Sequence, residues 1–214
     1  MSIISQLVRI IAPHECIGCG VEDHLLCSHC SATLPSAQVP VCPHGVATLY
    51  ATTCYQGLAK AVLHALKFER AVAAAEDIAR CMTTVITSSD IRAVAPIPTA
   101  SVRIRQRGYD QAQLIARAVA RHLHLPYTPL LLRIGNQRQL GAGRATRQQQ
   151  LCNAFRLKQG IELPNGPILL IDDVLTTGAT IEAAARVLRA AGAQRIDAAV
   201  FAVAEASQPP FKLV

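Results

Sequence analysis

The chain has 214 residues, of which 51% are hydrophobic and 16% are charged, so it can build a sizeable core and is not globally disordered. Its 21 Lys and Arg against 14 Asp and Glu give a net charge of +7. That balance favours phosphate-bearing partners (nucleotides, nucleic acid or anionic lipid), although many soluble proteins are mildly basic without binding any of them. The sequence has no apolar run of the ~18–20 residues that a membrane span needs. Residues 1–12 are apolar but interrupted by Arg9, so we expect no signal peptide and a cytoplasmic protein.

The first predicted element is a short amphipathic helix over residues 3–11. Two C-x-x-C pairs follow, seven residues apart: Cys16, Cys19, Cys27 and Cys30. In a reducing compartment clustered cysteines more often bind metal than form disulfides, and four thiolates can surround Zn²⁺ tetrahedrally. Because four protein ligands leave no open position, such a site is structural. Two coincidental thiol pairs or a redox switch are the alternatives.

The rest of the chain alternates between helical and strand patterns. Helices are predicted over residues 58–66, 71–86, 109–123 and 181–191, and strands over residues 91–98, 130–133, 167–172 and 196–204. Strands that alternate with helices predict an α/β, Rossmann-like fold with a parallel sheet, whose ligands bind at the carboxyl ends of the strands. We therefore expect two units, a helix and zinc-binding module at residues 1–48 and an α/β domain at residues 49–214.

One segment of the α/β domain carries a specific signal. The buried strand over 167–172 ends in the adjacent carboxylates of Asp172 and Asp173. A loop of small residues then opens directly into a helix: Thr176, Thr177, Gly178, Ala179 and Thr180. Backbone N–H groups and hydroxyls at a helix N-terminus form a phosphate cradle, and the two acids suit vicinal hydroxyls. A phosphate beside a diol predicts a ribose 5-phosphate site, the alternative being a plain helix cap with solvated acids.

This segment resembles the 5-phosphoribosyl 1-diphosphate (PRPP) binding motif of type I phosphoribosyltransferases. Further motifs are similar to the ComF family, which includes the GntX-like proteins: the N-terminal cysteine cluster, Leu66-Lys67-Phe68, Ala95-Pro96-Ile97-Pro98, Arg103-x-x-x-Arg107-Gly108-Tyr109-Asp110-Gln111-Ala112, and the pattern from Gln139 through Arg147 to Ala154-Phe155. Where the family usually has Phe-Asn, this chain has Tyr109 and Asp110.

The resemblance implies a type I phosphoribosyltransferase fold preceded by a small, zinc-ribbon-like module with four cysteine ligands. It implies that Asp172 and Asp173 bind the ribose hydroxyls as the candidate catalytic residues, and that residues 176–180 bind the 5-phosphate. Pro98 and Thr99 would lie near the diphosphate, with Mg²⁺ bridging. In the family's chemistry a nitrogen nucleophile displaces pyrophosphate from the anomeric carbon, so positioning and charge stabilisation dominate. No residue stands out as a general base.

Two groups of arginines admit two functional interpretations: Arg103, Arg105 and Arg107 after the Pro98 loop, and Arg133, Arg138, Arg144 and Arg147 along the stretch that follows, with the basic segment 134–150. In the first, the arginines neutralise the diphosphate of PRPP, and residues 134–150 close over it as a hood. In the second, the arginines contact the phosphate backbone of single-stranded DNA. A solvated loop is the third interpretation.

The ComF resemblance associates the chain with natural competence and transformation, through cytoplasmic handling of incoming single strands beside helicase-type partners. The alternative is an active, Mg²⁺-dependent phosphoribosyltransferase on an acceptor that the sequence does not identify. The sequence does not determine the oligomeric state either.

Overall fold

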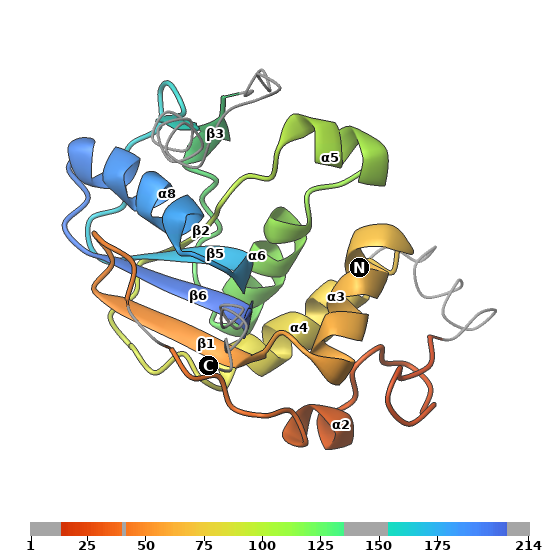
Figure 1. Cartoon of the computed structure of the whole chain (residues 1–214). Coiled ribbons are helices and arrows are strands. Elements are labelled where there is room, and N and C mark those ends of the chain that lie inside the picture. Colours follow the sequence, from red (N-terminus) through yellow and green to blue (C-terminus); the bar gives the residue numbers. More distant parts are fainter. Residues whose placement is uncertain (1–13, 40–41, 135–153, 205–214) are drawn as a thin grey trace, which may run out of the picture.

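The computed structural model describes residues 14–39, 42–134 and 154–204 (Figure 1). Its centre is a four-stranded sheet in the order β1-β6-β5-β2, in which every neighbouring pair is parallel. The strands are β1 (Thr48–Cys54), β2 (Ala93–Pro96), β5 (Ile168–Leu175) and β6 (Ile196–Val203). All eight residues of β6 are buried, as expected for a parallel strand with both faces covered. The predicted α/β fold with a parallel sheet is confirmed.

Helices cover both faces of this sheet. The core on one face is formed with α3 (Gly57–Phe68), α4 (Ala74–Thr83) and α6 (Gln111–His122). The core on the other face is formed with α8 (Ala179–Ala190) and a two-stranded antiparallel sheet of β3 (Leu131–Arg133) and β4 (Phe155–Leu157). Within the described ranges, no helix has the length and apolar character needed to cross a membrane.

The structure differs from the predicted elements in several places, and it also contains the short elements α2 (Ser28–Ala32) and β4, which were not predicted. The strand expected over 167–172 continues to Leu175, and the strand expected over 130–133 lies outside the main sheet. The edge strand β1 was not predicted, because only Thr53 in it is buried and its apolar pattern is weak. Helix α5 (Ser101–Arg107) was not predicted either, since it buries no residue and therefore has no apolar stripe. The helix expected over 3–11 lies outside the described residues.

The cysteine module packs directly on the α/β fold. It contains one short helix, α2 (Ser28–Ala32), and its Leu26 is fully buried in the same core as Leu63 of α3 and Ile78 of α4. The division at residue 48 remains a prediction about sequence units. In three dimensions the described part of the module shares its hydrophobic core with α3 and α4.

Candidate functional site

A cleft opens at the carboxyl end of the sheet, between β2 and β5. The β2 strand pairs with β5 only as far as Pro96 and Ile171, whereas β5 continues along β6 to Leu175. After β2 and the exposed α5, the chain continues into α6 on one face of the sheet, whereas α8, which follows β5, lies on the other face (Figure 1). Adjacent strands whose connections leave on opposite faces create a ligand crevice. Here the crevice has a volume of about 420 Å³.

Asp172 and Asp173 both line this cleft but point to different sides of the sheet, because successive residues of a strand alternate. Asp173 faces α3 and α6. Its Oδ2 accepts a hydrogen bond from Gln111 Nε2 at 3.0 Å and lies 3.0 Å from Lys67 Nζ. Gln111 is only 4% exposed, and its Oε1 has no partner among the described residues. Gln111 thus lines the cleft with its amide N–H group paired and its carbonyl oxygen buried without a partner among the described residues.

Asp172 lies near the β3–β4 side of the cleft. Burial raises the pKa of its carboxyl to about 7, and the neighbouring charge of Asp173 acts in the same direction. Its Oδ1 accepts a hydrogen bond from the Asp173 backbone at 2.8 Å. Arg133 of β3 also lines the cleft, packs over the Phe155 ring at 5.2 Å, and has its pKa lowered by burial. A ligand that donates hydroxyl groups or brings positive charge to Asp172 favours the ionised carboxylate.

The loop after β5 is built to admit an anion. Gly178, the N-cap residue of α8, has a φ of +80° and no side chain with which to cap the helix. A Cβ at this position would lie 3.2 Å from Pro43 Cγ, so a larger residue would be both strained and crowded. Thr176 and Thr180 line the cleft beside this helix N-terminus. Apart from a long 3.5 Å hydrogen bond from Ala179 N–H to Thr177 Oγ1, no side chain caps this helix N-terminus in the described residues, and a helix N-terminus beside hydroxyls can hold an anion.

Three consecutive residues at the start of α6, Tyr109 to Gln111, make hydrogen bonds to three segments around the cleft: the end of α3, the loop after β2, and β5. The Tyr109 hydroxyl donates to the Leu66 carbonyl at the end of α3. Asp110 caps α6 and accepts hydrogen bonds from Thr99 N and Thr99 Oγ1, both at 2.9 Å. Gln111 reaches Asp173 on β5. Residues 109–111 thus connect the loop that carries Thr99 to the end of α3 and to β5.

The predicted arginines separate into different places. Arg103 and Arg133 line the cleft, whereas Arg105 is exposed on α5. The Arg107 guanidinium lies 5.1 Å from the centre of the Phe68 ring, which is itself 64% exposed. The remaining three, Arg138, Arg144 and Arg147, lie outside the described residues.

The predicted metal ligands meet in one cluster. The Sγ atoms of Cys16, Cys19, Cys27 and Cys30 all lie within 4.8 Å of one another, and those of Cys19 and Cys27 are 3.6 Å apart. Tetrahedral Zn²⁺ with Zn–S bonds of about 2.3 Å separates its sulfurs by about 3.8 Å, so the residues fit this ion.

The four thiols are electrostatically unequal. Burial opposes ionisation of Cys16, but backbone N–H groups led by that of Cys27 outweigh it and lower the pKa of this thiol to about 6. Contact with Cys19 raises the pKa of Cys30 to about 12. Four thiolates therefore need a cation between them.

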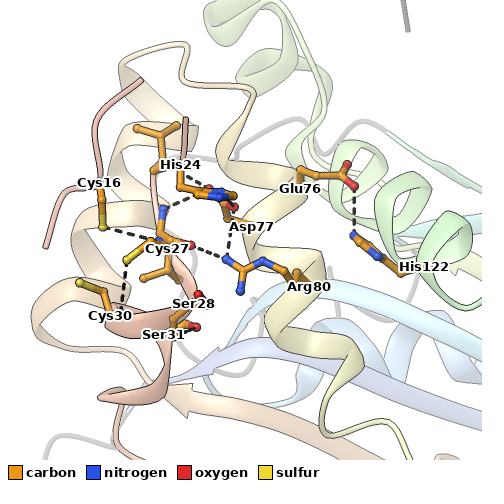
Figure 2. A network of polar contacts seen from close by, with 12 residues as sticks. Cys16, His24, Cys27, Ser28, Cys30, Ser31, Glu76, Asp77, Arg80 and His122 are labelled. Atoms are coloured by element: carbon orange, nitrogen blue, oxygen red, sulfur yellow. Dashed lines mark hydrogen bonds and ion pairs between the residues drawn. The ribbon is translucent and has the colours of Figure 1, made fainter. Parts of the chain in front are cut away.

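A buried carboxylate from α4 holds the second cysteine pair (Figure 2). Asp77 Oδ2 accepts hydrogen bonds from the backbone N–H groups of Leu25 and Leu26 at 2.8 and 3.1 Å. Its Oδ1 lies 2.9 Å from His24 Nδ1 and 3.3 Å from Arg80. Asp77 therefore fastens the loop before Cys27 to the α/β fold.

The sequence patterns assigned no site role to Lys67, Gln111 and Asp77, whereas Arg133, one of the predicted basic residues, does line the cleft. Lys67 and Gln111 stand in segments that resemble family motifs, and that resemblance was the available signal. Lys67 contacts Asp173 across 106 positions of the sequence and Gln111 contacts it across 62, so local patterns could not predict either contact. Asp77 lay in a run of alanines with no functional pattern.

The phosphoribosyl transferase domain family matches residues 109–212. Competence protein F of Haemophilus influenzae is 35% identical over 107 residues, which are 49% of this chain and 47% of that protein. Competence protein ComFC of Bacillus subtilis is 37% identical over 95 residues, 44% of this chain and 37% of that protein. The chain thus spans less than half the length of these two relatives.

A third relative matches over more of its length. Competence protein ComFC of Streptococcus pneumoniae is 24% identical over 197 residues, covering 82% of this chain and 86% of that protein. Among solved structures, the glutamine PRPP amidotransferase of B. subtilis matches 65% of this chain and 30% of its own, with a TM-score of 0.45 and 17% identity. Orotate phosphoribosyltransferase of Aeropyrum pernix matches 66% and 63%, with a TM-score of 0.38 and 19% identity.

Proposed function

We propose that this chain is a phosphoribosyltransferase-domain protein of the ComF kind, and that the cleft between β2 and β5 binds PRPP. The observation that carries the proposal is the arrangement along β5. An acid pair lies at the end of the strand, with the uncapped N-terminus of α8 beyond it and cationic side chains beside it. These groups match the 5-phosphate, the ribose diol and the diphosphate of one molecule.

Each part of PRPP has a proposed partner in the cleft. The 5-phosphate binds the Thr176–Thr180 loop, and the ribose hydroxyls donate to Asp172 and to the free Oε1 of Gln111. The diphosphate lies by Pro98 and Thr99, next to Arg103 and Arg133. The positive charge that develops on the sugar when pyrophosphate leaves is stabilised by the Asp172 carboxylate.

We propose two metal ions with separate roles. Zn²⁺ in the cysteine cluster is structural, as four thiolates leave no position for a substrate. Mg²⁺ prefers oxygen donors of the kind that the diphosphate and the Asp172 carboxylate provide. When bound, it supplies positive charge to the diphosphate leaving group.

The test is a calorimetric titration of PRPP with Mg²⁺ into the zinc-loaded protein and its Asp172→Asn/Asp173→Asn variant. We expect saturable binding by the wild type and a loss of at least about tenfold in affinity for the variant, about 1.4 kcal/mol or more. Asp90→Asn is the control, because Asp90 is exposed before β2, at the opposite end of that strand from the cleft. Well-folded wild type that does not bind PRPP would contradict the proposal.

The same two proteins separate a transferase from a binding protein. Pyrophosphate release that depends on an added nitrogen nucleophile, and that the double variant lacks, identifies an active phosphoribosyltransferase. PRPP binding without pyrophosphate release over a panel of nucleobases and amines favours a binding role in competence.

We further propose that α5 and the end of α3 bind single-stranded DNA, which places the protein in the handling of incoming strands. What supports this is the exposure of α5, which buries none of its residues and carries Arg103, Arg105 and Arg107, the last of which packs on the exposed Phe68 ring. Cations that follow a phosphate backbone and a ring on which bases stack are typical of such surfaces.

The DNA proposal predicts a salt-dependent affinity. Replacing Arg105 and Arg107 by alanine is expected to weaken binding of a single-stranded oligonucleotide about tenfold at low salt and to reduce the slope of log K against log salt by about 1.4. Arg186→Ala on α8 is a matched control, since Arg186 is exposed over the opposite face of the sheet. Equal affinities of the wild type and the double variant, measured by fluorescence anisotropy, would exclude this surface as the binding site for single-stranded DNA.

A further inference from the structure

Lys67 is the feature of the cleft that the proposed roles above do not use. It lies in the last turn of α3, and its ammonium is 3.0 Å from Asp173 Oδ2. Its side chain is only 15% exposed. A lysine is rarely buried to this extent unless it is paired, and here its partner is one of the two acids at the end of β5.

The position of Lys67 is determined by its surroundings. The preceding residue, Leu66, is fully buried, and its carbonyl accepts the hydrogen bond from Tyr109. These contacts hold the end of α3 in place, and the Lys67 side chain lines the cleft and reaches Asp173. The ammonium is therefore part of the built site.

The ion pair with Lys67 leaves Asp173 Oδ2 less available to a metal ion or another ligand. Its Oδ2 already receives both the ammonium of Lys67 and the amide of Gln111. A divalent cation at that oxygen would meet another positive charge about 3–4 Å away, which is strongly unfavourable in a partly buried cleft. The Lys67 ammonium therefore occupies the position beside Asp173 that a divalent cation would otherwise take.

We propose that Lys67 is a PRPP-binding residue whose ammonium takes over part of the charge compensation otherwise supplied by a divalent cation. With Arg103 and Arg133, Lys67 gives the cleft three cations against the two carboxylates. The cleft then has one positive charge in excess without any metal, and it binds PRPP when Mg²⁺ is absent. This inference rests on the proposed PRPP site and adds a metal-independent mode of binding to it.

The test measures PRPP affinity with and without Mg²⁺ for the wild type, Lys67→Met and Lys60→Met. The divalent-free buffer is prepared by resin treatment, since a soluble chelator would also remove zinc from the cysteines. Methionine keeps the unbranched, apolar length of the side chain and removes the charge. Lys60 is exposed two turns earlier on the same helix and serves as the matched control.

We expect the wild type and Lys60→Met to bind PRPP without Mg²⁺ within about tenfold of their affinity with it. Lys67→Met should lose at least about tenfold without Mg²⁺ and recover most of that loss when Mg²⁺ is added. This recovery also shows that the variant is folded.

Three results would overturn the inference while the PRPP site itself stands. They are wild type that binds only with Mg²⁺, Lys67→Met that is unaffected in divalent-free buffer, and Lys67→Met that is impaired equally with and without Mg²⁺. Wild type that binds in neither buffer would instead refute the proposed function. The two failures are thus distinguishable in one set of titrations.

Discussion

Serine at both Cys16 and Cys19 is expected to lower the zinc content of the purified protein from about one equivalent to near zero. The remaining Cys27 and Cys30 cannot complete a tetrahedral site. Because Cys16, Cys27 and Cys30 are at most 6% exposed and lie in the core beneath α3 and α4, loss of the ion also removes order from that core. Structural zinc sites contribute on the order of 10 kcal/mol or more to folding, so we expect a large fall in melting temperature.

The measurement is metal analysis by mass spectrometry beside thermal unfolding followed by circular dichroism. A variant with serine at Cys42 and Cys54 is the control, since these thiols are respectively exposed and half-buried and lie outside the cluster. It should retain its zinc. Retention of a full equivalent by the Cys16→Ser/Cys19→Ser variant would exclude the cluster as the zinc site.

Replacing Asp77 by alanine is expected to destabilise the protein by about 3–5 kcal/mol, the usual cost of removing one partner from a buried charge pair. Asp77 is only 5% exposed, and the variant leaves the N–H groups of Leu25 and Leu26 without their acceptor. Arg80 loses its carboxylate in the same step. The loop before Cys27 should then detach from α4, and zinc should leave more readily.

Two variants test the Asp77 prediction. Asp77→Asn keeps one acceptor oxygen and should cost less than alanine in urea unfolding. Glu76→Gln alters the adjacent residue, whose carboxylate pairs at the surface with His122 (Figure 2) and with Arg121. This change should alter the free energy of unfolding by about 1 kcal/mol or less. An equal loss of unfolding free energy in Glu76→Gln and Asp77→Ala would contradict the prediction that the buried Asp77 stabilises the protein more than the surface Glu76.

Local patterns along the chain were sufficient to predict the centre of the fold. The apolar run before Asp172, the Thr-rich loop and the helix after Gly178 are contiguous, so one segment contained both the strand and its phosphate-binding loop. The cysteine spacing likewise predicted a cluster, because C-x-x-C turns bring their own sulfurs together. The elements without an apolar pattern, β1 and α5, were missed, since β1 is a half-buried edge strand and α5 buries nothing.

The sequence by itself determined the α/β fold class, the two acids with their anion loop, and the four thiols, since each of these depends on residues close together in the chain. Only the tertiary structure decided how the acids differ. Alternation along β5 directs Asp173 toward Lys67 and Gln111 and leaves Asp172 near Arg133. It also decided that Asp77 of α4 holds the cysteine loop. These contacts join residues 50 or more positions apart in most cases, and local periodicity carries no information about which distant side chains the folded core brings into contact.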